Sequence, residues 1–395
     1  MIEEIKKLDK EYYMNTFGDR LPVAFEKGEG MVLTSTEGEK FYDFLGGIAV
    51  NSLGHSHPKF TKALKNQIDK VLHVSNLYYI ENQARLAKKI VEHSYADKVF
   101  FCSTGAEANE GAFKLAKIYF YKKGIEKYEI ISLDKSFHGR TLATVAATGQ
   151  EKYQKPYHPL TPGFIQVEPN NLDAIKAAIT DKTAAIMIEP IQGESGVHPM
   201  DKEYIEGLRK LCDEKEILLI FDEVQTGMGR CGEWYCQKLY GVEPDIFTSA
   251  KALGGGVPIG AIGAKAFVAD AFTPGDHGTT FGGNPLATAA GLAVFDIYEE
   301  ENLVENSKKM GELFKAELNA LMNKYPEKIV DVRGAGLLIG AELVPDIAKD
   351  VFNALFKKGF LTSLCGNTLR LAPPLIITEK EIKLFTDTLE EILKG

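Results

Sequence analysis

Residues 246–256 read Ile246-Phe247-Thr248-Ser249-Ala250-Lys251-Ala252-Leu253-Gly254-Gly255-Gly256. The apolar start of this stretch predicts a buried strand, and the three glycines predict a turn directly behind it. Lys251 lies between the strand and the turn. Lysine is usually a solvated surface residue, so a lysine in this position is expected to be a buried amine that gives up its proton readily. Such an amine can act as a nucleophile and condense with an aldehyde.

A second apolar run ends in an acidic residue. Residues 217–221 have the composition of a buried strand, and Asp222 follows them directly. A buried carboxylate is costly without a cationic partner. A pyridine nitrogen is a suitable partner, because the carboxylate keeps it protonated and the ring can then accept electrons from a carbanion. Alone, Asp222 is more simply explained as the cap of a turn or helix. Together with Lys251, it favours pyridoxal 5'-phosphate as the cofactor.

The composition excludes several classes of protein. The chain has 395 residues, of which 45% are hydrophobic, enough for a large core in two lobes. The net charge of −9 and the mixed signs predict no nucleic-acid partner. No signal peptide and no bilayer-spanning run is apparent, so no membrane partner is expected. The five cysteines are odd in number and lack zinc-ligand spacing, which predicts a cytoplasmic protein without a metal site.

Strand and helix patterns alternate between about residues 60 and 290. The expected strands are 98–102, 129–133, 184–188, 217–221 and 245–249, and two of the helices between them are 107–121 and 202–215. Continuous apolar strands separated by helices predict an α/β fold with a mostly parallel sheet that helices cover. Ligands bind at the carboxyl ends of such strands, where Asp222 and Lys251 fall.

The pattern changes after about residue 290. The expected elements there are a long helix over 285–321, strands over 329–332 and 336–343, a further helix and strand, and a closing helix. They predict a smaller α+β domain, against which the first ~45 residues are expected to pack. We therefore predict a large cofactor-binding domain of residues 46–290 and a small domain formed by residues 1–45 and 291–395.

Three further segments could contact a ligand. Gly105 and Ala106 open a helix, where free N–H groups and small residues suit a phosphate, although a plain capped turn is the alternative. Phe137 could stack on a flat ring and Arg140 could clamp a carboxylate, although a core phenylalanine and a surface arginine are the alternative. The hydroxyl groups of residues 278–285 could bind phosphate or carboxylate, although Asn-Pro turn chemistry is also typical of a structured loop.

Together these segments resemble the pyridoxal-phosphate-dependent aminotransferases that act on ω-amino groups. The resemblance covers nearly the whole chain and is carried, in order, by residues 103–110, 137–141, 189–194, 222–227, Lys251, 279–285 and 369–374. It implies the fold of pyridoxal-phosphate-dependent transferases, and it implies a homodimer whose active sites are shared between the subunits.

The resemblance also implies the residues that hold the cofactor. Lys251 would bind it covalently and act as the catalytic base, and Asp222 would pair with the pyridine nitrogen. Gln225 would approach the ring hydroxyl, and Phe137 would stack on the ring. The other implied cofactor contacts are the N–H groups of Gly105 and Ala106, the neighbours Glu223 and Val224, and Thr280 of the partner subunit.

The implied substrates are N2-acetylornithine as the amino donor and 2-oxoglutarate as the acceptor, with glutamate as a product. Arg140 would bind the donor's α-carboxylate, and Thr279 would lie near the substrate. Arg370 would bind the α-carboxylate of glutamate, and Glu194 would neutralise Arg370 when the ω-amine donor is bound. The alternative for Glu194 and Arg370 is a permanent surface ion pair of little energetic weight.

Other functions share most of these motifs. Ornithine, succinylornithine, succinyldiaminopimelate and 4-aminobutyrate are alternative donors, and aminomutases and racemases use the same scaffold. A degenerate scaffold that only binds other molecules is the alternative outside the enzymes. Such a protein is expected to have lost Lys251 or Asp222, and both are present.

Overall fold

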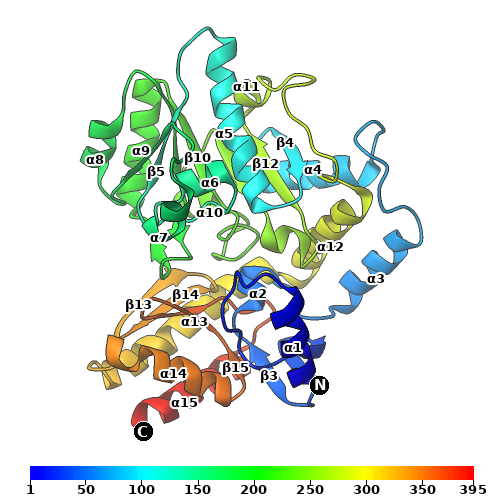
Figure 1. The fold of residues 1–395 in the computed structure, drawn as a ribbon, viewed down its shortest axis with the longest axis vertical. Coiled ribbons are helices and arrows are strands. Elements are labelled where there is room, and N and C mark those ends of the chain that lie inside the picture. The colour runs from blue at the N-terminus through cyan, green and yellow to red at the C-terminus, as the bar shows by residue number, and fades with distance from the viewer.

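The computed structural model describes all residues from Met1 to Gly395. A seven-stranded sheet with the order β4-β12-β11-β10-β7-β5-β6 forms the centre of the upper part of the molecule in Figure 1. Its strands are β4 (Lys98–Cys102), β5 (Glu129–Leu133), β6 (Phe164–Val167), β7 (Thr183–Ile188), β10 (Leu218–Asp222), β11 (Ile246–Ser249) and β12 (Gly260–Ala264).

This sheet is mostly parallel, as the sequence predicted. Only β12 runs antiparallel to its neighbours β11 and β4, whereas the pairs from β11 to β6 are all parallel. The helices that accompany the sheet are α3 (Pro58–Ile68), α4 (Glu81–His93), α5 (Gly105–Lys122), α6 (Leu142–Ala147), α7 (Glu151–Gln154), α8 (Leu172–Ala178), α9 (Lys202–Lys215), α10 (Cys236–Tyr240), α11 (Ala266–Ala269) and α12 (Pro285–Glu301). The α/β fold class is therefore confirmed.

The predicted strands are present with small shifts at their ends, but β6 was not predicted, and neither was β12. This strand reads Gly-Ala-Ile-Gly-Ala, so Ile262 is its one bulky β-branched residue of the kind typical of strands. Its packing requires small residues. A Cβ atom on Gly263 would lie 2.1 Å from the Phe247 ring, and one on Gly260 would lie 2.4 Å from the Thr104 carbonyl oxygen.

Two four-stranded sheets form the lower part of the molecule, where both chain termini lie (Figure 1). One has the order β1-β2-β3-β15 and the other β13-β14-β17-β16. Their strands are β1 (Phe25–Glu29), β2 (Val32–Ser35), β3 (Lys40–Asp43), β13 (Ile329–Ala335), β14 (Leu338–Leu343), β15 (Phe360–Leu361), β16 (Ser363–Cys365) and β17 (Thr368–Leu371). The pairing of β3 with β15 supports our proposal that residues 1–45 and 291–395 form one domain.

The helix predicted over 285–321 is two helices, α12 and α13 (Leu303–Lys324). They are separated at Asn302, whose φ of 52° is left-handed and ends α12. The strand predicted from 336 begins at Leu338, because Gly336 has a φ of 51° and forms a turn. The remaining elements are α1 (Ile2–Tyr12), α2 (Gly46–Ala49), η1 (Lys155–Tyr157), β8 (Ile191–Gln192), β9 (His198–Pro199), η2 (Lys251–Gly254), α14 (Pro345–Lys357) and α15 (Glu379–Lys394). None of the helices is long and apolar enough to cross a membrane.

Candidate functional site

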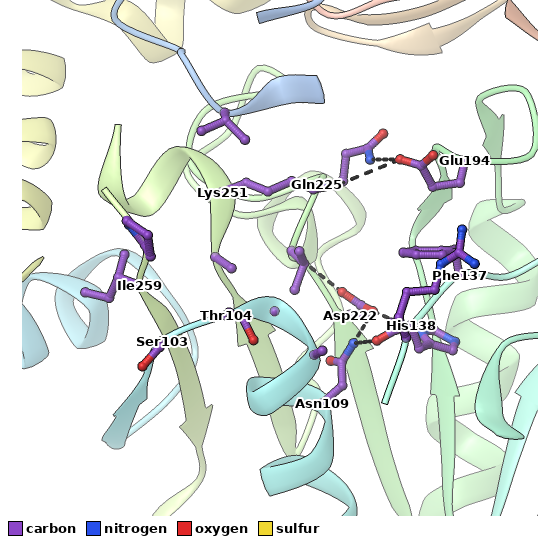
Figure 2. A pocket seen from close by; sticks show the side chains of 18 of the residues that line it. Ser103, Thr104, Asn109, Phe137, His138, Glu194, Asp222, Gln225, Lys251 and Ile259 are labelled. Carbon is purple, nitrogen blue, oxygen red and sulfur yellow. Dashed lines mark hydrogen bonds and ion pairs between the residues drawn. The ribbon is translucent and has the colours of Figure 1, made fainter. Parts of the chain in front are cut away.

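A cavity of about 520 Å³ lies at the carboxyl ends of β10 and β11 (Figure 2). The predicted site residues that line it are Gly105, Ala106, Phe137, Arg140, Glu194, Asp222, Val224, Gln225 and Lys251. These residues come from five separate parts of the chain, and the parallel sheet brings them together. The cavity is the site that the sequence predicted for the ends of these two strands.

Lys251 enters this cavity directly after β11. Its φ of 49° is left-handed, which is rare for a residue with a side chain and turns the chain sharply out of the strand. Its Nζ atom lies 4.0 Å from Oε1 of Glu194 and makes no shorter contact with an acidic group. Burial lowers the pKa of Lys251, although the Glu194 carboxylate acts in the opposite direction. The side chain is therefore a buried amine with an accessible neutral form.

Asp222 ends β10 at the bottom of the cavity and is held by four donors, the most distant of which is Oγ1 of Thr248, 3.5 Å from Oδ1. Oδ2 accepts hydrogen bonds from Nδ2 of Asn109 and from Nδ1 of His138, both at 2.8 Å. Oδ1 accepts the N–H group of Val224 at 3.0 Å. Figure 2 shows Asn109 and His138 converging on this carboxylate. The donors fix the orientation of the carboxylate.

Asn109 is in turn held in one orientation. Its Nδ2 also donates to the carbonyl oxygen of His138 at 2.7 Å, and its Oδ1 accepts from Oγ1 of Thr248 at 2.7 Å. The sequence analysis assigned no role to Asn109, His138 or Thr248. Asn109 and His138 stand within the motifs that carry the resemblance, but only the fold places them on Asp222.

The start of α5 borders the cavity with two free N–H groups. Oγ1 of Thr104 accepts the N–H of Glu107 at 3.2 Å, and the N–H of Ala108 bonds within the turn. The N–H groups of Gly105 and Ala106 have no partner within the chain. A Cβ atom on Gly105 would lie 2.8 Å from Cγ1 of Val224, so the absence of a side chain keeps this end of the cavity open. Free N–H groups at a helix N-terminus suit a phosphate.

Phe137 partly lines the cavity, and a buried acid holds its backbone. The N–H of Phe137 donates to Oε2 of Glu189 at 2.9 Å. Burial, followed by the charge of Asp222, raises the pKa of Glu189 well above its usual value. Glu189 lines the cavity but was not singled out as a site residue from the sequence. It lies in the quoted segment 189–194, which was the only available signal.

Glu194 forms the centre of a polar cluster on another wall. Its Oε1 accepts from NH1 of Arg370 at 2.6 Å and from Nε2 of Gln225 at 2.9 Å. Burial raises the pKa of Glu194, but the charges of Arg370 and Lys251 outweigh it and the pKa is lowered. Arg370 itself is only 3% exposed. A buried pair of this kind is costly to separate unless another ion replaces the missing partner.

Four predicted residues do not line this cavity, namely Glu223, Thr279, Thr280 and Arg370, the last of which lines a neighbouring cavity. The Glu223 side chain points to the start of α10, where it accepts the N–H groups of Cys236 and Gln237. A contact of Glu223 with the cofactor stays a prediction, and this carboxylate is not among the groups that line the cavity. Thr279 and Thr280 line a separate cavity of about 400 Å³, which shares Ser103 with the main one.

Arg140 borders the main cavity as an exposed side chain, with its guanidinium carbon 3.8 Å from the centre of the Tyr153 ring. No group of three or more His, Cys, Asp or Glu side chains is arranged to hold a metal ion.

The donor set fits pyridoxal 5'-phosphate. Lys251 supplies a buried amine for the aldehyde, and Asp222 supplies an oriented carboxylate for a pyridine nitrogen. The start of α5, where Gly105 and Ala106 line the cavity, supplies N–H groups for the phosphate.

Comparison with known proteins agrees with this chemistry. The aminotransferase class-III family matches residues 13–393. The chain is 51% identical to the acetylornithine aminotransferase of Methanocaldococcus jannaschii, covering 98% of this chain and 96% of that protein. It is 50% identical to the acetylornithine aminotransferase of a Nostoc species, covering 96% and 91%.

Solved structures of the same kind are also similar. The ornithine aminotransferase of Toxoplasma gondii has a TM-score of 0.94 and 32% identity, covering 100% of this chain and 95% of that one. The acetylornithine aminotransferase of Elizabethkingia anophelis has a TM-score of 0.87 and 35% identity, covering 99% and 98%. This chain therefore belongs to the class-III aminotransferases and is a pyridoxal-phosphate-dependent enzyme.

Proposed function

We propose that this enzyme transfers the terminal amino group of N2-acetylornithine to 2-oxoglutarate. The products are N-acetylglutamate 5-semialdehyde and glutamate, which places the reaction in arginine biosynthesis. The observation that carries the proposal is the Arg370–Glu194 pair beside Lys251. The names of relatives that are 46–51% identical support N-acetylornithine as the donor.

The bound cofactor supplies an electron sink for the carbanion that forms next to the reacting nitrogen. Lys251 would hold the cofactor, and its Nζ atom would accept and return the proton at the substrate carbon. Asp222 keeps the pyridine nitrogen charged, and Asn109 and His138 keep Asp222 in position. Phe137 limits the movement of the ring from one side.

The Arg370–Glu194 pair allows one cavity to accept two different acids. A donor that reacts through its terminal amine has no carboxylate beside the reacting carbon, so Glu194 stays on Arg370 and neutralises it. Glutamate has its α-carboxylate beside that carbon, so it takes the place of Glu194 on Arg370. If Glu194 were absent, the half-reaction of the terminal-amine donor would leave the buried Arg370 without a carboxylate partner, which is costly.

Arg140 is positioned to bind the donor's other end. Its side chain lies at the rim of the cavity, stacks on Tyr153 and makes no ion pair. The N–H groups of its guanidinium are therefore free to bind the α-carboxylate of the donor. Thr279 is proposed to lie near this end of the substrate.

We further propose a cytoplasmic homodimer with shared sites. Thr280 of the partner subunit would complete the phosphate site, because the chain's own Thr280 lines a different cavity from Lys251. The five cysteines are all free, which supports a reducing compartment.

A substrate panel tests the proposal. The purified holoenzyme is supplied with 2-oxoglutarate and with N-acetylornithine, N-succinylornithine, ornithine or 4-aminobutyrate, and kcat/KM is compared. The highest value is expected for N-acetylornithine. Ornithine is the main competitor because of the similar ornithine aminotransferase structure, and a higher value for ornithine would refute the proposed donor.

Glu194→Ala tests the exchange of carboxylates. Removing Glu194 frees Arg370 for an α-carboxylate, so the half-reaction with glutamate is expected to gain at least about tenfold relative to that with N-acetylornithine, a difference of about 1.4 kcal/mol. Each half-reaction is followed separately through the cofactor absorbance. Glu312→Ala, an exposed position on α13, is the control. An unchanged ratio would show that Glu194 does not exchange with the substrate.

A further inference from the structure

A second cavity of about 390 Å³ lies behind the Arg370–Glu194 pair. Glu194 lines both this cavity and the catalytic one, and Arg370 lines this one. Tyr153 also lines the second cavity, and Arg140, which stacks on its ring, lines the first. The two compartments are therefore neighbours, and the ion pair forms part of the wall between them.

The second cavity has an excess of positive charge. Lys135 and Lys152 line it together with Arg370, whereas Glu194 is its only acidic lining residue. Neither lysine forms an ion pair within the chain, and Nζ of Lys152 lies 4.7 Å from the centre of the Tyr153 ring. His198 also lines the cavity, but burial and then the charge of Arg333 lower its pKa, so it adds no charge at neutral pH.

Other features of this cavity also suit a carboxylate. Oγ of Ser195 is buried and has no hydrogen-bond partner, so a donor is available beside Glu194. The backbone of Lys135 is anchored, with its N–H bonded to the carbonyl oxygen of Gly149 at 2.7 Å. Its φ of 64° is left-handed, as expected for a tight turn that directs the side chain.

We propose that this second cavity receives the Glu194 carboxylate when a substrate carboxylate takes its place on Arg370, and that Lys135 and Lys152 hold it there. The inference rests on the proposed exchange of carboxylates. The present partners of Glu194 are Arg370, Gln225 and Lys251, and the last two line the catalytic cavity. Once displaced from Arg370, the Glu194 carboxylate needs another cationic partner. Rotation about the side-chain torsions of Glu194 can move this carboxylate without moving the backbone.

This arrangement makes the two lysines specificity residues that do not touch the substrate. They favour the displaced position of Glu194, so they assist only ligands with a carboxylate beside the reacting carbon. A donor that reacts through its terminal amine leaves Glu194 on Arg370 and gains nothing from them. Because the lysines are exposed, their effect is modest and is screened by salt.

The test is a double-mutant cycle on the holoenzyme. Lys135→Gln/Lys152→Gln is combined with Glu194→Gln, and Lys309→Gln/Lys380→Gln, at two exposed lysines without ion pairs, is the control. The unreactive dicarboxylate glutarate is the probe, and its dissociation constant is measured by calorimetry at low and high salt. The half-reactions with glutamate and N-acetylornithine are followed through the cofactor absorbance.

With Glu194 present, the lysine changes are expected to weaken glutarate binding roughly threefold to tenfold and to slow only the glutamate half-reaction. In the Glu194→Gln background the same lysine changes are expected to have no effect, because the side chain at position 194 then has no carboxylate for the lysines to bind. An equal loss of glutarate affinity in both backgrounds would mean that the lysines contact the ligand itself. No loss of affinity in either background would show that the lysines do not bind the displaced Glu194 carboxylate. If N-acetylornithine is not a substrate but the glutarate cycle behaves as expected, only the proposed donor is wrong.

Discussion

At the scale of single residues, the site depends on groups that orient other groups. Asp222 is a useful partner for a pyridine nitrogen only because Asn109, His138 and the Val224 N–H hold its two oxygens in place. Phe137 is similarly held through its backbone by Glu189. The residues proposed to contact the cofactor are thus positioned by neighbouring side chains that also border the cavity, as is common where orientation decides the chemistry.

Glu223 makes the stability of the protein depend on pH. Burial raises the pKa of this carboxyl from 4.5 to about 7, against the opposing N–H groups of Gln237 and Cys236. The folded protein therefore holds the proton more tightly than the unfolded chain, so this stability is present below pH 4.5 and is lost as pH rises towards 7. The loss is expected to be on the order of 3 kcal/mol.

Urea unfolding of the native protein and of Glu223→Gln at several pH values between 4.5 and 8 measures this effect. The difference between their free energies of unfolding isolates Glu223 from the other acids. That difference is expected to change in favour of the glutamine variant as pH rises. A difference that does not vary with pH would mean that Glu223 titrates normally.

At the scale of elements, β12 joins the edge strand β4 to the parallel strands of the large sheet, because it lies between β4 and β11. Gly263 of β12 is paired with Phe247 of β11, and the phenyl ring occupies the space where a side chain of Gly263 would lie. β11 leads directly into Lys251. A strand whose only large side chain is that of Ile262 therefore packs beside the strand that leads to Lys251.

Gly263→Ala tests this packing. The added methyl group is expected to overlap the Phe247 ring and to destabilise the protein by about 1–3 kcal/mol. Gly278→Ala is the matched control, because no atom lies within 4 Å of the place that its methyl group would take, and a change of less than about 0.5 kcal/mol is expected there. Thermal unfolding of both variants is compared. Equal melting temperatures would show that the ring of Phe247 moves aside without cost.

At the scale of the whole molecule, a large apolar surface is exposed. The segment between α3 and α4 carries exposed apolar side chains, and Phe281 lies beside it, with its ring centre 5.5 Å from that of His73. The exposed members are Ile68, Val71, Leu72, Leu77, Tyr78, Tyr79 and Phe281. Exposed apolar side chains that are concentrated in one segment are typical of an interaction site, and the neighbouring Thr280 makes this segment the best candidate for the proposed dimer interface.

Tyr79→Asp is expected to weaken self-association at least tenfold, because Tyr79 is fully exposed in the single chain and a charge would be buried in the dimer. Sedimentation velocity over a dilution series measures the dissociation, and cofactor affinity is expected to fall with it if Thr280 of the partner subunit holds the phosphate. Tyr121→Asp, at an exposed position on α5, is the control. A monomeric native protein, or a variant that dimerises normally, would contradict this interface.

The fold class and the ends of the main strands could be predicted because their signals are local. Runs such as 98–102 and 129–133 are apolar and bounded by turns, and the structure has strands with these limits. β12 could not be predicted, because its glycines are explained only by neighbours in the folded chain, the Phe247 ring at Gly263 and the Thr104 carbonyl oxygen at Gly260. The prediction of a single helix over 285–321 was wrong because Asn302 adopts a left-handed conformation. Asparagine tolerates this conformation, but its presence in a sequence does not predict it.

The sequence by itself determined the chemistry of this protein: a lysine after one apolar strand, an aspartate after another and a small-residue helix start after a third. Each of these patterns is short and local, and the sheet then brings the residues that follow its strands to the same edge. Only the tertiary structure decided what surrounds them. It joined Asn109 to Asp222, turned Glu223 away from the cavity, and gave Glu194 and Arg370 a second cavity with Lys135 and Lys152. The physical reason is that hydrogen bonds, ion pairs and burial depend on distances between residues far apart in the chain, which local patterns do not specify.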